Sequence, residues 1–495
     1  MAPPLFNGDV NTWNTAKVTN MQSAFQNATA FNKPIGNWNT ASVTNMTSMF
    51  AGATSFNQPI NSWNVSGVTD MHWLFRGATA FNQPLDAWNT AKVTTMASMF
   101  QNTSAFNQPI NAWNTASVTS MVTMFANATA FNQPLNSWDV SHVTNVVAMF
   151  ASATSFNQPL NNWNTSNFTS LNSTFYGASS FNQNISSWNT SNVTDLMDTF
   201  RNASSFNQSL NSWDVSHVTR MVQTFSGIFD YASFNQPLDH WNTASVTTMV
   251  EMFSGNTAFD QDISSWNVTS IIQTGVTWST QGLARMFVPN LLEKDDTSGG
   301  LSGEHQDALL VAWAGQSVQP NVIFNLGLKR YSTTGAAAIT SLRNNHNWQI
   351  NEQYQVTYSP GVNAIVSGTS TQVVSSNDYA FSSTTEPVTI TPNEGYRFLG
   401  WSDGRTDNPR TDIPTDNLTV TADIRAIPHN TATRIRPWPV ENNSATSTNQ
   451  VSPATTSTIP NQVPTSGYQQ TAAKIELIKK LITLLTQLLQ TIPSR

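Results

Sequence analysis

One short motif in the sequence could carry catalytic chemistry. Gly400-Trp401-Ser402-Asp403-Gly404 has the spacing of a nucleophile elbow, and Asp412 and His429 follow in the order Ser, Asp, His. Such a serine needs a strand before it and a helix directly after it. The sequence that follows, 405–409, is a polar turn ending in proline, which disfavours helix in the preceding residue. We therefore expect no catalytic residue here and no enzyme.

The composition argues against several other kinds of site. With 21 basic and 28 acidic residues and a net charge of -7, the chain lacks the positive field that binds a nucleic-acid backbone. It has no cysteine, which excludes disulfides, thiolate zinc sites and iron–sulfur clusters. Only 10 % of the residues are charged, against roughly 25 % in typical soluble domains. We expect no nucleic-acid partner and no cofactor.

Tryptophan recurs at a fixed interval, and its neighbours recur with it. It occupies positions 13, 38, 63, 88, 113, 138, 163, 188 and 213, and then 241 and 266. One unit, from Phe81, reads F-N-Q-P-L-D-A-W-N-T-A-K-V-T-T-M-A-S-M-F-Q-N-T-S-A. A period of 25 residues indicates a repeat array, with each coil packing on its neighbours. Residues 1–282 are therefore predicted to form a solenoid of about ten repeats.

Each unit predicts a short strand followed by a short helix, as in leucine-rich repeats. The strand is expected at 88–90, with Trp88 and Thr90 in the core and Ala87, Asn89 and Ala91 on the other face. The apolar spacing over 93–100 indicates a turn or two of helix.

The residue after each tryptophan forms a polar column that is our candidate ligand-binding surface. Alternatively, these side chains only bond to one another or to the backbone between coils. The column comprises Asn39, Asn64, Asn89, Asn114, Asp139, Asn164, Asn189 and Asp214.

Two groups of residues invite a metal site, and neither has suitable spacing. His142 and His217 lie three units apart, roughly 14 Å at sheet spacing, whereas metal–ligand distances are about 2 Å. The second group lacks the D-x-D-x-D-G pattern of a calcium loop. It comprises Glu293, Asp295, Asp296, Glu304 and Asp307. We expect no metal.

The repeated F-N-Q-P-L-x-x-W-[ND]-[TV]-[SA]-x-V-T-x-M-x-x-M-F resembles the 25-residue unit of the BspA-like leucine-rich-repeat surface proteins. Members of that family are cell-surface proteins, and some are adhesins for host matrix proteins or other cells. The resemblance implies an extracellular binding or structural role for this chain.

The period ends before residue 283, and 283–351 is predicted to cap the array. Helices are expected around 309–313 and 336–342, and short strands at 322–324 and 348–350. The segment is similar to the region that closes the array in the same family. No such cap precedes the first unit.

Residues 352–427 predict a small all-β module, because apolar and polar residues alternate between turn sequences. Strands are expected at 355–358, 372–374, 388–390 and 418–422. The run T-P-N-E-G-Y-R-F-L-G-W-S-D-G over 391–404 resembles the InlB-type B repeat of bacterial surface proteins. That resemblance implies a spacer.

The last two segments predict a linker and an amphipathic helix. Residues 428–470 are rich in Ser, Thr, Asn, Gln and Pro and are predicted to be disordered. Residues 471–495 are predicted to form an oligomerising or membrane-anchoring helix, because apolar residues recur at three-four spacing. The expected contact residues are Ile475, Ile478, Ile482, Leu485, Leu489 and Ile492.

The order of these parts predicts a non-catalytic adhesion protein at the cell surface. Its partner would be a protein or glycan on host or neighbouring cells. The alternative is a subunit of an extracellular filament, self-associating through the terminal helix or the open first coil. A weaker alternative is that the asparagine face binds glycan or ordered water. The chain start lacks the features of a secretory signal, so we expect an extracellular protein whose leader is already removed.

Overall fold

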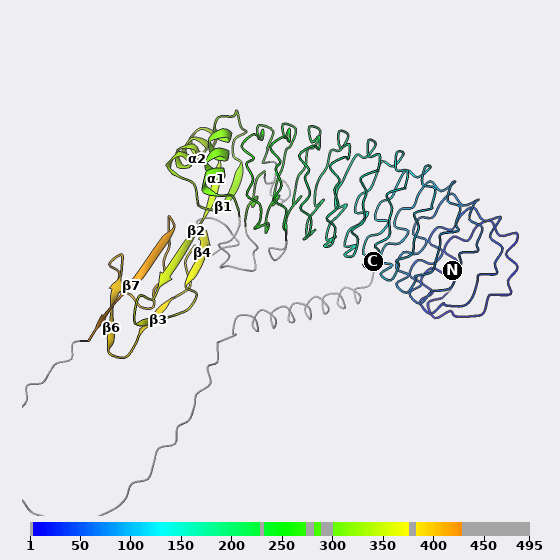
Figure 1. Cartoon of the computed structure of the whole chain (residues 1–495), viewed down its shortest axis with the longest axis horizontal. Helices are drawn as coiled ribbons and strands as arrows, with labels where there is room; N and C mark the ends of the chain where they lie inside the picture. The colour runs from blue at the N-terminus through cyan, green and yellow to red at the C-terminus, as the bar shows by residue number, and fades with distance from the viewer. Residues whose placement is uncertain (1–2, 228–231, 274–281, 289–299, 376–382, 428–495) are drawn as a thin grey trace, which may run out of the picture. The chain divides into compact units, whose positions relative to one another are not determined.

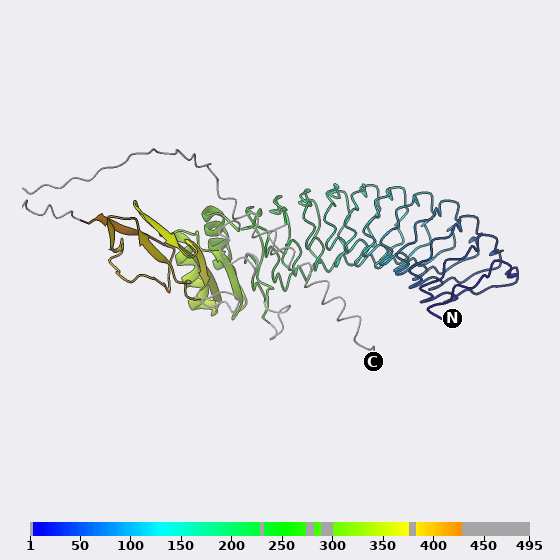
Figure 2. The same cartoon turned by 90° about the horizontal axis from the view of Figure 1, so that it is seen from below.

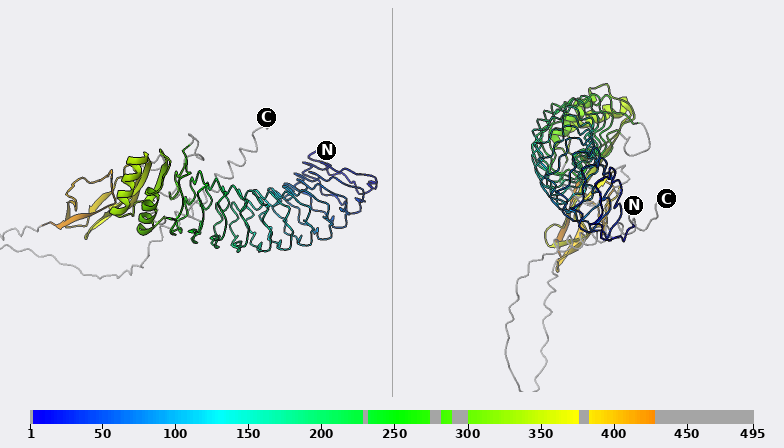
Figure 3. Two further views of the ribbon diagram at one scale, coloured as in Figure 1. Left: turned by 90° about the horizontal axis from the view of Figure 1, so that it is seen from above. Right: turned by 90° about the vertical axis from the view of Figure 1, so that its right-hand side faces the viewer.

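The computed structural model describes residues 3–227, 232–273, 282–288, 300–375 and 383–427. The described residues up to 288 run in successive coils that lie side by side (Figure 1, Figure 2 and Figure 3). Equivalent aromatic rings of neighbouring coils stack, with centroids 5.7 Å apart for Phe100 and Phe125 and 6.3 Å apart for Trp88 and Trp113. The core is therefore a set of continuous ring columns, to which each coil contributes the same residues.

Over one segment of each coil, successive backbone N–H groups alternate between two kinds of acceptor, one in the next coil and one in the same coil. In the coil that begins at Phe81, every second amide donates to a carbonyl of the next coil, and the amides between them close turns within their own coil. The donors to the next coil are Met96, Ser98, Phe100 and Asn102. The donors that close turns are Met99, Gln101 and Thr103. The two sets of hydrogen bonds together satisfy the backbone N–H groups of this segment, although the segment is neither a helix nor an extended strand.

The predicted helix over 93–100 is absent. Ser98 and Asn102 have left-handed backbone conformations, with φ of 56° and 59°, and a helix requires consecutive right-handed residues. The predicted strand at 88–90 is absent as well, because the described coils pair through isolated bridges such as Thr95 with Ser120. The predicted burial is confirmed, since Trp88 and Thr90 are 3 % and 1 % exposed while Asn89 is exposed.

Side chains connect the coils where the strand was expected. The indole Nε1 of Trp113 donates to the carbonyl of Leu85 in the preceding coil at 2.9 Å. The hydroxyl of Thr115 donates to the carbonyl of Asp139 in the following coil at 2.8 Å. Buried tryptophan and threonine thus supply the inter-coil hydrogen bonds that a strand would have made with its backbone.

Two helices and two strands follow the coils, as predicted. They are α1 (Gly303–Ala314), β1 (Ile323–Leu328), α2 (Thr333–His346) and β2 (Gln349–Ser359). Ser302 and Ser332 accept hydrogen bonds at the two helix starts, which explains where the helices begin. Trp313 and Phe324 are fully buried in the same apolar cluster as the coils. Leu283 of the last coil bridges to Phe324 of β1, so this segment covers the end of the array.

The remaining strands form a β module that is joined to the preceding segment by β2. They are β3 (Ala364–Ser367), β4 (Thr371–Ser375), β5 (Thr389–Pro392), β6 (Tyr396–Trp401) and β7 (Leu418–Ala426). One sheet has the order β1-β2-β7-β6 with β4 also on β2, and β3 pairs with β5. The predicted boundary between 351 and 352 lies inside β2. The four predicted strands are present, whereas β3 and β6 were not predicted.

Candidate functional site

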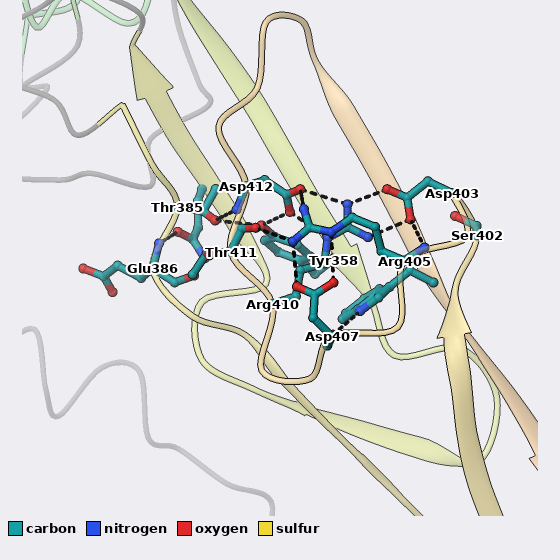
Figure 4. Close-up of polar contacts among 12 residues, drawn as sticks. Tyr358, Thr385, Glu386, Ser402, Asp403, Arg405, Asp407, Arg410, Thr411 and Asp412 are labelled. Carbon is teal, nitrogen blue, oxygen red and sulfur yellow. Dashed lines mark hydrogen bonds and ion pairs between the residues drawn. The ribbon is translucent and has the colours of Figure 1, made fainter.

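The described residues around the G-x-S-x-G motif do not form a catalytic triad. Ser402 lies in the turn after β6, and its hydroxyl accepts the backbone N–H of Thr421 at 3.1 Å. The next element is the strand β7, so the helix of a nucleophile elbow is missing, as predicted. Asp412 accepts hydrogen bonds from Arg410 and Tyr358, both at 2.7 Å (Figure 4). His429 lies outside the described residues.

Arg410 organises this end of the β module. Its side chain is 1 % exposed, its guanidinium pairs with Asp403 and Asp412, and its Cζ lies 5.2 Å from the ring centroid of Trp401. Hydrogen bonds from Arg410 hold the pKa of Asp403 below its usual value. Burial would raise the pKa of Asp412, but hydrogen bonds from Arg410 and Tyr358 outweigh it and hold that pKa low as well. These paired charges fix the loop after β6 and leave no poised acid or base.

The eight residues of the polar column after the tryptophans are all exposed, and their oxygens are already used. Asn89 Oδ1 accepts the N–H of Ala91 at 3.2 Å, and Asn114 Oδ1 accepts that of Ala116 at 3.0 Å. The other members make the same contact two residues along. This is a turn closed within one coil, and not the bond between coils that the alternative interpretation expected. In the described part of the chain no acceptor engages the Nδ2 groups of the asparagines, so these donors face solvent.

The two aspartates of the column use the same turn. Hydrogen bonds from the hydroxyl and the N–H of Ser141 hold the pKa of Asp139 below its usual value. Ser216 has the same effect on Asp214. The neighbouring His142 and His217 are exposed, and each ring lies within hydrogen-bond distance of the adjacent serine, Ser141 or Ser216. No group of three or more His, Asp or Glu in the described ranges could hold a metal ion.

A second asparagine column, in the F-N-Q-P sequence, does connect the coils, and the sequence analysis missed it. Asn107 Oδ1 accepts the N–H of Asn132 at 3.0 Å and the side-chain amide of Gln133 at 2.9 Å. The members of this inter-coil ladder are Asn7, Asn32, Asn57, Asn82, Asn107, Asn132, Asn157, Asn182, Asn207 and Asn235. Its signal was the constancy of Asn and Gln before the proline.

Four columns that change from coil to coil lie together on the segment of alternate amides. In the coil from Phe81 they are Thr95, Ala97, Ser98 and Gln101, and we call this surface the variable face. Two of these columns are in contact, since Arg201 of the Gln101 column donates to Gln223 of the Ser98 column at 2.9 Å. A column-by-column comparison of the units would have found this face, because a constant repeat places ligand recognition on its variable positions.

Late in the array the variable face carries charges that neutralise one another. Arg201 pairs with Asp198 at 3.3 Å and donates to Gln223 at 2.9 Å, and Glu251 pairs with Arg285 at 3.2 Å. Gln223 also donates to Glu251 at 2.6 Å. Burial raises the pKa of Asp198 in spite of Arg201. These residues form an internal chain that binds coil to coil.

Early in the array the variable face carries an aromatic residue and an arginine. The guanidinium carbon of Arg76 lies 5.1 Å from the ring centroid of Trp73, and Arg76 Nε donates to Gln101 at 2.8 Å. The ring centroids of His72 and Trp73 lie 4.4 Å apart, and the backbone N–H of His72 donates to Asp70 Oδ1 at 2.8 Å. We call these five residues the Trp73 cluster.

The predicted contacts of the terminal helix cannot be placed, because 428–495 lies outside the described residues. Within the described part, neither helix is long and apolar enough to cross a membrane.

Comparison with known families places the chain among surface-associated repeat proteins. A family model described as "Mycoplasma protein of unknown function, DUF285" matches residues 2–102, 74–186, 133–229 and 219–287, which together cover more than half of the chain. A divergent InlB B-repeat domain matches residues 354–428, which confirms that resemblance. Neither the curated proteins nor the solved structures contain a match. Both matched families are typical of surface or extracellular proteins, and neither description names an enzyme.

Proposed function

Because this chain belongs to the family of Mycoplasma proteins of unknown function, DUF285, and carries a divergent InlB B-repeat domain, we propose that it is a non-catalytic adhesion protein of the cell surface. Its coils would form a BspA-like leucine-rich-repeat solenoid whose surface binds host matrix or other cells. The β-bridges and the stacked rings that join residues 25 positions apart support this architecture.

The observation that carries the proposal is the preorganised polar surface of the coils. The column after the tryptophans repeats an exposed amide whose oxygen is held by its own turn. A ligand that meets such a surface orders few protein side chains, so little of the binding energy is lost to conformational entropy. With few charges, recognition would depend on hydrogen bonds and stacking and would respond weakly to salt.

The parts after the coils fit the same proposal. The β module would act as a spacer, the segment 428–470 as a flexible stalk, and 471–495 as an oligomerising helix or a peripheral membrane contact. A protein or glycan on host or neighbouring cells would be the partner.

The direct test is adhesion of microspheres coated with the full chain to immobilised matrix proteins and to cells. We expect wild-type beads to adhere, and adhesion to change little between low and physiological salt. If wild-type beads do not adhere to any of these surfaces, the proposal is wrong.

A triple variant asks whether the exposed asparagine column is the contact. Replacing Asn89, Asn114 and Asn164 with lysine should reduce adhesion at least tenfold, because the long charged side chain displaces the amide donors. The matched control places lysine at Asn61, Asn111 and Asn161, a second polar column of the coils. Equal effects of the two triple variants would remove the column from the proposal. Filaments in electron micrographs across a concentration series would instead favour a structural subunit.

A further inference from the structure

The Trp73 cluster departs from the repeat on the variable face. Where Trp73 stands, the neighbouring coils have Ser48 and Ser98, and where Arg76 stands, the coil after it has Gln101. The backbone is the same in all three coils, with φ of 62° at Trp73, 57° at Ser48 and 56° at Ser98. The change is therefore one of side chains on a constant frame, and the fold itself does not require it.

Arg76 is held in place and keeps its charge unpaired. Its guanidinium lies against the Trp73 ring, and its Nε is taken by Gln101, while its side chain remains exposed. Arg201 and Arg220, the other arginines of the described coils up to residue 273, each have a carboxylate within 3.5 Å. Arg76 has none in the described part of the chain. A stacked guanidinium with free terminal nitrogens presents a fork suited to a carboxylate.

A small apolar area continues from the cluster along the variable face. Ala97, Val122, Val147 and Ala148 occupy its columns in the next three coils, and all four are half-buried. Farther along this face the first of these columns is apolar again at Met197, Val222 and Val250, but Val222 and Val250 are buried in a cluster of their own. The adjacent column there carries Asp198, Gln223 and Glu251, so the half-buried apolar residues without charged neighbours are those beside the Trp73 cluster. An aromatic residue and an arginine beside an apolar area are the composition of a protein interface, whose energy concentrates in Trp, Tyr and Arg.

We propose that Trp73 and Arg76 anchor a docking surface for a protein segment that presents a carboxylate next to apolar side chains. The carboxylate pairs with Arg76, and the apolar side chains cover the Trp73 ring and the alanine and valine side chains beyond it. The unpaired positive charge sets the sign of the partner, and the apolar area favours a polypeptide over a polysaccharide. This inference goes beyond the proposed function, because it adds a second contact on the variable face and gives it a partner class.

The repeat supplies variants that preserve the fold. Trp73→Ser and Arg76→Gln each install the residue that a neighbouring coil already has at that place. Lys92→Ser is the matched control, because it removes an exposed charge from another column, where Ser117 stands in the next coil. The labelled full chain is applied to an array of 12-residue synthetic peptides in three series. Leucine and valine alternate with Asp or Glu in the first, with Asn or Gln in the second, and with Lys in the third.

We expect wild type and Lys92→Ser to bind the acidic series about tenfold more tightly than the amide series, the value of one charge-assisted hydrogen bond. Arg76→Gln should lose that preference, and Trp73→Ser should weaken binding to both series. Equal binding of the three series by wild type, or unchanged binding by both variants, would overturn the inference. So would Arg76-dependent capture of polygalacturonate without any peptide binding.

The bead assay separates the two proposals. If beads carrying Trp73→Ser or Arg76→Gln adhere as well as wild-type beads, the adhesion proposal is supported and the proposed docking surface is wrong. If the peptides bind as expected but no bead adheres, the docking surface stands and adhesion is wrong.

Discussion

Two asparagines of one coil should differ sharply in their contribution to stability. Asn107 Oδ1 accepts two hydrogen bonds from the next coil, from the N–H of Asn132 and the amide of Gln133, and both are partly buried. Asn114 Oδ1 accepts one exposed bond, from Ala116 in its own turn. The same substitution to alanine therefore removes an inter-coil contact at one site and a solvated turn contact at the other.

The magnitudes follow from what is left unpaired. In Asn107→Ala the N–H of Asn132 loses its acceptor where water reaches it poorly, and Gln133 loses its partner, so we expect a loss of about 2 kcal/mol. In Asn114→Ala water replaces the amide oxygen, and the loss should be about 0.5 kcal/mol.

Native-state hydrogen exchange of the full chain measures both effects locally, which matters because a repeat array need not unfold in one step. The amide of Asn132 should exchange roughly 30-fold faster in Asn107→Ala, the equivalent of about 2 kcal/mol. In Asn114→Ala it should change little. Equal acceleration of that amide by both variants would refute the assignment of the inter-coil ladder to the F-N-Q-P asparagines.

Two further predictions address the core and the β module. Trp113→Phe retains a ring in the column but removes the indole donor to the carbonyl of Leu85, which keeps only the N–H of Trp88, and the smaller ring leaves space in the core. It should therefore cost about 1 to 3 kcal/mol in chemical denaturation. Trp13→Phe, at a ring 58 % exposed, should cost under about 0.5 kcal/mol. Asp412→Asn should destabilise the β module by about 3 to 5 kcal/mol at pH 7, because Arg410 stays buried without its full charge partner. The pKa of Asp412 is lowered in the folded protein, so its stabilisation is complete above the unfolded value of about 3.9 and is lost as the pH falls through the folded value. Denaturation midpoints from pH 7 to pH 2 should fall less steeply for Asp412→Asn than for wild type.

The repeat let the sequence predict burial better than secondary structure. Trp88 and Thr90 are buried as expected, because stacking identical units forces equivalent side chains inward together. The local pattern over 93–100 suggested a helix, yet Ser98 adopts a left-handed conformation that sequence periodicity does not reveal. Pairing with the next coil decided that backbone, since its N–H donates to Val122.

The candidate surfaces show the same limit. The exposure of Asn89 and Asn114 was predictable from alternation along the chain, but the use of their oxygens in local turns was not. The sequence also contains Trp73 and Arg76 as departures from the unit, but the stacking of one on the other is a tertiary contact.

By itself the sequence determined the period, the core columns, the order of parts and the scarcity of charge, because each depends only on residue type and spacing. The tertiary structure alone decided which polar groups pair and which remain available to a ligand. Those bonds join residues about one coil apart, and their geometry is set by how one coil rests on the next. Asn107 and Asn114 are two asparagines of one coil. The neighbouring coil donates a hydrogen bond to the side chain of Asn107, whereas the side chain of Asn114 stays at the surface.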